Sequence, residues 1–138
     1  MRTLIPALLA GFLIPTTPAA AQGNDTTIVA AVLPTSRAIR TGDTATAFAT
    51  IINAGSNAAE NCRIALGSAA PAGSFSFQTT DAANALTGSP DTAIDIAAGA
   101  AQGFVFAFTA TQAYSGGDLP LVFDCDNTQP AVDSPGVN

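Results

Sequence analysis

The chain has 138 residues and a formal net charge of −6, and 48% of its residues are hydrophobic whereas only 10% are charged. This composition argues against intrinsic disorder, which needs low hydrophobicity and high charge. The four basic residues are too few to favour binding to nucleic acid or to an anionic membrane surface. The chain has no histidine, which excludes the Ser-His-Asp and Cys-His classes of catalysis and leaves its two cysteines with too few partners for a tetrahedral zinc site.

The N-terminal segment has the pattern of a cleavable secretory signal. Arg2 precedes an apolar run of 11 residues, 4–14, and the alanines at 19–21 supply an A-x-A cleavage site. The run is shorter than the ~20 residues that span a bilayer. We therefore expect residues 1–21 to be removed before Gln22, which predicts a secreted, periplasmic or cell-surface protein without a membrane span. The remaining 117 residues contain three arginines and ten acidic residues, a net charge of −7.

The remaining sequence predicts β-strands rather than helices. Glycine, proline, asparagine and aspartate interrupt it at short intervals, and the segments between them alternate apolar and polar residues. In chain order the predicted strands cover residues 26–33, 44–53, 61–66, 74–79, 93–97, 102–109 and 119–126. Seven short strands separated by turns predict an all-β fold, an immunoglobulin-like β-sandwich, over residues 22–126. Residues 127–138 are polar and contain proline, so we expect a flexible tail.

Two cysteines, Cys62 and Cys125, fall on the apolar faces of predicted strands. Cys62 alternates with Ile64, and Cys125 alternates with Phe123. An even pair of cysteines in an exported chain favours a disulfide, and two inward-facing residues can meet in the core as disulfide geometry requires. We expect the disulfide to join two inward strand faces of the sandwich. The alternative is a pair of buried free thiols.

The predicted strand 44–53 has two apolar faces of different size. One face carries Ala47, Ala49 and Ile51, and the other carries Phe48 and Ile52 among threonines. The favoured interpretation places Phe48 and Ile52 in the core, because large apolar residues are usually buried. The alternative places the alanine face in the core and exposes Phe48 and Ile52, which would then mark an interaction surface.

Acidic residues gather around the last predicted strand. Asp124 and Asp126 share a face about 7 Å apart, and with Asp118 and Asn127 they are candidate ligands for calcium, which prefers carboxylate and carbonyl oxygens. The alternative is a solvated, acidic strand end, because no calcium loop motif is present. No other cofactor is expected. The same carboxylates could serve a glycosidase, but a chain with one tyrosine and no tryptophan has few residues to line a sugar cleft.

Two runs of the sequence resemble a known family. Residues 42–55 carry a Gly-Asp-Thr turn, an alternating strand and a closing Asn-Ala-Gly, and residues 94–100 carry a short strand and an Ala-Gly turn before the phenylalanine-rich strand. This pattern resembles bacterial cell-surface immunoglobulin-like domains, including CARDB-like modules and surface repeats. The resemblance implies a sandwich fold and an exterior location, and it transfers no functional residue. The chain departs from antibody-type domains because it lacks the core tryptophan, and Tyr114 stands 11 residues before Cys125 instead of two.

These observations predict an exported, non-catalytic binding or structural module whose partner is a protein or a surface polymer. One alternative is a fimbrial-type assembly subunit, because such subunits are exported and pair by strand donation. A second alternative is a hydrolase that relies on carboxylates alone.

Overall fold

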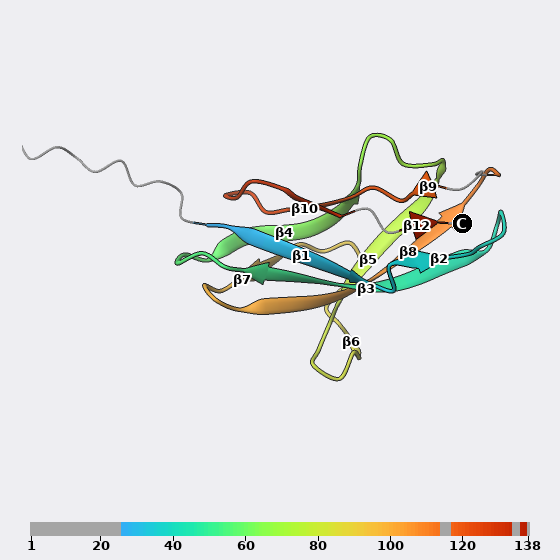
Figure 1. Cartoon of the computed structure of the whole chain (residues 1–138). Coiled ribbons are helices and arrows are strands. Elements are labelled where there is room, and N and C mark those ends of the chain that lie inside the picture. The colour runs from blue at the N-terminus through green and yellow to red at the C-terminus, as the bar shows by residue number, and fades with distance from the viewer. Residues whose placement is uncertain (1–25, 114–116, 134–135, 138) are drawn as a thin grey trace, which may run out of the picture.

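The computed structural model describes residues 26–113, 117–133 and 136–137, which form two β-sheets packed face to face and a small third sheet (Figure 1). The five-stranded sheet has the order β1 (Ile28–Leu33), β3 (Thr44–Asn53), β8 (Ala101–Ala110), β5 (Gly73–Thr80) and β6 (Leu86–Thr87). The four-stranded sheet has the order β11 (Ala131–Asp133), β10 (Leu121–Asp124), β4 (Ala59–Leu66) and β7 (Ile94–Ile96). The third sheet contains β2 (Ser36–Arg37), β12 (Gly136–Val137) and β9 (Gly117–Asp118). The described residues include no helix of the length and apolarity needed to cross a membrane.

The strand order confirms the predicted immunoglobulin-like sandwich. β1, β3, β8 and β5 pair antiparallel in that order, and β4, β10 and β11 are antiparallel neighbours in the other sheet. Taken in chain order, these seven strands have the A-B-E-D and C-F-G arrangement of an immunoglobulin domain. Each predicted strand coincides with an observed strand to within two residues at either end.

The segment after residue 126 contains strands that the sequence did not predict. β11 pairs with β10, and β12 pairs with β2 and β9. Short strands therefore occupy residues 131–133 and 136–137 within the segment 127–138, for which the sequence predicted a flexible tail. A strand of two or three residues is too short to show an alternating pattern in the sequence. Its hydrogen-bonding partners also lie in distant parts of the chain, so no local signal marks it.

The core is filled by pairing large residues of one strand with small residues of its neighbour. Phe104 and Phe106 of β8 are buried and lie in register beside Ala49 and Ala47 of β3. The ring of Phe77 on β5 adds an edge-to-face contact, with its centroid 6.1 Å from that of Phe104. Phenylalanine rings therefore occupy the space above Ala47 and Ala49, and this part of β3 needs no large inward side chain.

This packing corrects the favoured interpretation of strand 44–53. Phe48 and Ile52 are 44% and 41% exposed, whereas Ala49 and Ile51 are buried at 2% and 0%. The rule that large apolar residues lie inside fails here because β8, the neighbouring strand, already supplies the volume. The alternative interpretation, with both side chains on the surface, matches the structure.

The predicted disulfide between Cys62 and Cys125 is present, and both residues are buried. Their Cα atoms are 4.1 Å apart. Asp124 pairs with Arg63 in the register of β10 and β4, so the cysteines are the next opposed pair. The bond therefore links neighbouring strands of one sheet, with both sulfurs facing inward, rather than one sheet to the other.

Asn53 holds the two sheets together at the end of β3. Its side chain is fully buried, and its Nδ2 donates to the carbonyl oxygens of Asn57, Ile96 and Ala97 at 2.8, 2.9 and 3.2 Å. Its Oδ1 accepts from the backbone N–H of Gly55 at 3.0 Å. Since Ile96 belongs to β7 of the four-stranded sheet, this one amide joins β3, the following turn and the opposite sheet.

Candidate functional site

The side of the five-stranded sheet that points away from the core carries large apolar side chains. On β1, Val29 and Leu33 are 51% and 69% exposed, and they lie in register with Ile52 and Phe48 of β3. Cross-strand partners on one face have Cβ atoms about 5 Å apart. The four side chains therefore form a ridge along the β1–β3 half of the sheet.

We call this side of β1, β3, β8 and β5 the outer face, and it carries no charged residue. The residues that alternate onto it are Val29, Ala31, Leu33, Thr44, Thr46, Phe48, Thr50, Ile52, Ser74, Ser76, Gln78, Thr80, Ala101, Gly103, Val105, Ala107 and Thr109. The outward side of the four-stranded sheet differs, because it carries Arg63 and Asp124, which form an ion pair. The two exterior surfaces of the sandwich therefore have opposite chemical character.

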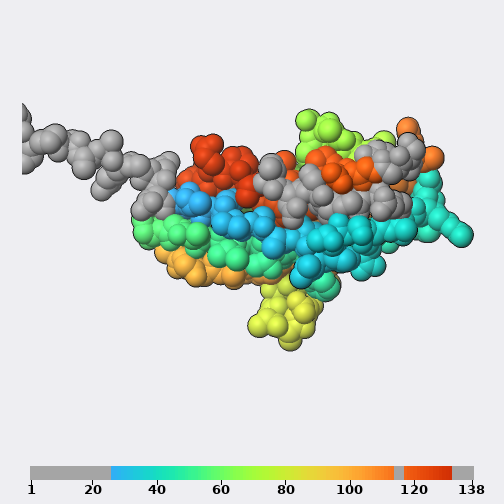
Figure 2. Space-filling model, viewed as in Figure 1, coloured from blue at the N-terminus to red at the C-terminus, as the bar shows by residue number. Residues whose placement is uncertain are grey.

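A hollow lies beside the ridge on the β8–β5 half of the outer face. Its volume is about 310 Å³, and its lining includes Thr46, Gln78, Leu86, Val105 and Ala107. The β6 hairpin, which carries Leu86, projects from the body of the molecule beside this hollow (Figures 1 and 2). Leu86 is 61% exposed, so the hollow has an apolar wall open to solvent.

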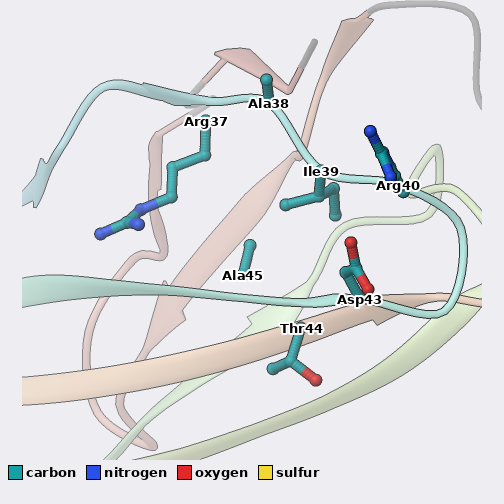
Figure 3. Close-up of a pocket in the computed structure, with 7 residues that line it drawn as sticks. All are labelled: Arg37, Ala38, Ile39, Arg40, Asp43, Thr44 and Ala45. Atoms are coloured by element: carbon teal, nitrogen blue, oxygen red, sulfur yellow. The ribbon is translucent and has the colours of Figure 1, made fainter.

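A second hollow, of about 640 Å³, lies under the segment between β2 and β3 (Figure 3). It is lined by Arg37, Ile39, Arg40, Asp43 and neighbouring residues. The side chains of Arg37 and Arg40 extend in different directions, and the carboxylate of Asp43 lies on the same side as Arg40 (Figure 3). The two guanidinium groups do not converge on one point, so the arrangement does not build an anion site.

The structure brings together two of the four predicted calcium ligands, and it gives them a cation from the protein. Arg63 Nη2 donates to Asp124 Oδ2 at 3.1 Å, and Arg63 Nη1 donates to Asp126 Oδ1 at 2.9 Å. Asn61 Nδ2 donates to the other oxygen of Asp126 at 2.9 Å. The hydrogen bond from Arg63, followed by that from Asn61, lowers the pKa of the Asp126 carboxyl.

The other two predicted ligands have separate structural positions. Asn127 Oδ1 accepts from the backbone N–H of Glu60 at 3.0 Å, and its Nδ2 donates to the carbonyl of Ala58 at 2.9 Å. Asp118 lies on β9 in the small sheet. Over the described residues, no three histidine, cysteine, aspartate or glutamate side chains are grouped as a metal site would need.

The arginine contact also bears on the predicted carboxylate pair. A glycosidase needs one carboxyl group that stays protonated, which requires a raised pKa. Asp126 has a lowered pKa, and Asp124 is bound by the same guanidinium. The lowered pKa of Asp126 is the opposite of what a general acid requires.

Sequence reasoning named Phe48 and Ile52 as surface candidates and missed Val29, Leu33 and Leu86. Residues 29, 31 and 33 are Val, Ala and Leu, and the residues on the other face of the same strand, 28, 30 and 32, are Ile, Ala and Val. Because both faces are apolar, the sequence does not reveal which one is exposed. The signal for the surface is the register that places Leu33 beside Phe48, and a single sequence does not contain it.

Comparison with known proteins adds evidence on the fold. No family model and no curated protein matches the chain. Among solved structures, a family 123 glycoside hydrolase from Clostridium perfringens, described in work on glycolipid glycan hydrolysis, is similar with a TM-score of 0.57 and 9% sequence identity. The match covers 81% of this chain and 27% of that one, so the chain spans about a quarter of that enzyme. At this identity the likeness concerns the fold alone.

Proposed function

We propose that the protein is an exported, non-catalytic binding module and that the outer face of the five-stranded sheet is its recognition surface. The observation that carries the proposal is the ridge of Val29, Leu33, Phe48 and Ile52, which is exposed on a face without charge. Contiguous exposed apolar surface on a protein is characteristic of an interaction site. The core is complete without these side chains, so packing gives no reason for them to be apolar.

Two features support action outside the cytoplasm. Disulfides form and persist in oxidising compartments, and Cys62–Cys125 is the bond that such a compartment allows. The predicted signal, residues 1–21, lies outside the described residues. Expression of the full chain with fractionation and N-terminal sequencing tests this part, and the expected mature N-terminus is Gln22. Recovery of the protein in the cytoplasm with Met1 retained would overturn it.

The hydrogen bonds that Arg63 donates to Asp124 and Asp126 support the proposal that the module is non-catalytic. Both carboxylates are committed to Arg63, and Asp126 also accepts from Asn61. We expect the mature protein to leave a panel of aryl glycosides unhydrolysed. Hydrolysis that disappears in Asp126→Asn but persists in an exposed control, Asp95→Asn, would show that the carboxylates are catalytic.

Site-specific photocrosslinking tests the recognition surface itself. A photoreactive phenylalanine analogue is placed at Leu33, at Ile52 or at Ala65, which is exposed on the other sheet. On the producing cells, we expect adducts from positions 33 and 52 that are lost when Phe48→Ser is added, and none from position 65. Adducts from position 65 alone, or from none of the three, would overturn the outer face as the recognition surface.

A further inference from the structure

We infer that the occupant of the outer face is a second copy of this chain, and that the two copies form a two-fold dimer by packing these faces together. This inference rests on the proposed function, because it names the partner of the same surface. It is carried by three independent properties of the face, namely its charge, its shape and its area.

Charge favours this face over any other for contact between identical acidic molecules. The chain has a net charge of −6, so two copies repel each other in most orientations. The Asp124–Arg63–Asp126 group lies on the opposite side of a sandwich whose layers are about 10 Å apart. Across a dimer these groups would be separated by more than the Debye length of about 8 Å at physiological salt.

Two carboxylates of the segment after β5, those of Asp81 and Asp91, lie beside the face and are hydrogen-bonded to backbone N–H groups. Asp81 Oδ1 accepts from the backbone N–H groups of Ala83 and Ala85, each at 2.9 Å. Asp91 Oδ1 accepts from the N–H of Phe77 at 2.9 Å. These groups would form part of a polar rim, which is the usual surround of an apolar interface centre.

The shape of the face is complementary to itself. A two-fold axis that lies in the interface along the strands, between β3 and β8, places the Leu33 and Phe48 end of each ridge over the hollow of the other copy. The register row across the sheet is Leu33, Phe48, Val105 and Gln78. The rotation reverses this row, so Leu33 faces the partner's Gln78 and Phe48 faces the partner's Val105.

Both contacts of the reversed row fall on the hollow. Val105 and Gln78 line it, and its volume of about 310 Å³ exceeds the ~150 Å³ that accommodates a benzene ring. Each contact occurs twice in the dimer, as an isologous interface requires. Strands related by this axis run nearly parallel, which is compatible with the aligned packing of two sheets.

The area of the outer face is of the order that each partner buries in a dimer of standard size. β3 and β8 have ten residues each, and β1 and β5 have six and eight. At a rise of about 3.3 Å per residue and a spacing of about 4.8 Å, these four strands cover on the order of 550 Å² in projection. Side-chain relief and the projecting β6 hairpin increase the accessible area beyond that value. A stable interface buries about 800 Å² on each partner.

Light scattering coupled to size-exclusion chromatography of the exported, disulfide-intact protein tests the inference. We expect twice the mass of one chain at about 100 µM and dissociation on dilution toward the micromolar range. Leu33→Ser and Phe48→Ser should each yield the monomer with an unchanged circular-dichroism spectrum. Their melting temperatures should match that of wild type at a dilution at which wild type is also monomeric, because association itself stabilises the native state. The control Ala65→Ser, on the other sheet, should leave the dimer intact.

A short bifunctional maleimide tests the geometry, because it joins cysteines that lie within its reach across the interface. The rotation places Thr46 over the partner's Ala107, and neither residue belongs to the ridge. An equimolar mixture of Thr46→Cys and Ala107→Cys should therefore crosslink more than either variant alone. A wild-type protein that stays monomeric would overturn the second copy as occupant, while adducts from Leu33 and Ile52 to another molecule would still support the proposed function. A dimer that survives both serine variants, or an open series of larger species, would also overturn the inference.

Discussion

Replacing Asn53 by aspartate changes one atom of a buried amide and removes its two donors. In the structure, Nδ2 donates to the carbonyl oxygens of Asn57 and Ile96, and more weakly to that of Ala97, while Oδ1 accepts from Gly55 N–H. In Asn53→Asp the hydrogen bond from Gly55 N–H survives, but the second carboxylate oxygen replaces Nδ2 and faces the carbonyl oxygens of Asn57 and Ile96. The introduced negative charge then has no donor on that side and no access to water.

The expected loss of stability follows from these contacts and depends on pH. A buried charge without a partner destabilises by about 3–5 kcal/mol, a large share of the ~5–15 kcal/mol that stabilises a domain. Below the unfolded pKa of about 3.9 the introduced carboxyl is protonated, and its O–H can donate to the carbonyl of Ile96. Burial and the facing carbonyls raise its folded pKa above the unfolded value. Stability is therefore retained at acid pH and is lost as pH rises from the unfolded toward the folded pKa.

Urea unfolding at pH 3.5 and pH 7, with the disulfide intact, measures this difference. Asn57→Asp, an exposed change in the same turn, is the matched control and should alter stability by less than about 0.5 kcal/mol at either pH. Asn53→Ala should lose about 3 kcal/mol at both values, because it removes three short hydrogen bonds without adding a charge. An Asn53→Asp variant as stable as wild type at pH 7, or equally destabilised at both pH values, would refute the role assigned to this amide.

Arg63→Gln should raise the pKa of Asp126, because the arginine hydrogen bond is the largest cause of its lowering; carboxyl titration by NMR measures it, and an unmoved pKa contradicts the structure. Because the folded pKa of Asp126 is lowered, the stability that this carboxylate contributes is lost as pH falls through that pKa. In Arg63→Gln this loss of stability at acid pH should be smaller. Calcium at millimolar concentration should leave the melting temperature unchanged; a rise that is abolished in Asp126→Asn would establish the calcium site. Cys62→Ala with Cys125→Ala should lower the free energy of unfolding by about 2–4 kcal/mol in denaturant titrations, and a smaller loss would mean that the unfolded chain is barely constrained. Gly73→Ala should destabilise by about 1–3 kcal/mol in the same assay, because a Cβ there would lie 2.5 Å from a β8 phenylalanine ring and a β8 carbonyl; a neutral effect would place β5 differently.

The strands were predictable from the sequence because alternation and turn residues are local properties. Segments such as Thr44–Asn53 and Ala101–Ala110 alternate over ten residues, and the structure places them where the sequence did. The cysteine pairing was predictable from composition and compartment. The strand order was predictable only at the level of fold class, since pairing joins residues that are far apart in the chain.

The candidate site was less predictable, because each of its properties depends on a neighbour. Whether Phe48 lies inside or outside depends on Phe104 and Phe106, which fill the core above the alanines of β3. Whether Asp126 is a metal ligand depends on Arg63, which the register of β4 and β10 brings against it. Both residues were identified from the sequence, but their partners were not.

The same packing explains why surface and fold can be tested separately. Rings from β8 and β5 fill the core above Ala47 and Ala49, so this part of β3 contributes small residues inside and carries the large Phe48 outside. Removing the ring of Phe48 takes little apolar surface out of the core, whereas removing that of Phe104, which is fully buried, leaves a cavity that destabilises by about 3–5 kcal/mol. If Phe48→Ser lost as much stability as Phe104→Ala in the monomeric state, Phe48 would belong to the core, and the outer face could not be a recognition surface for any partner.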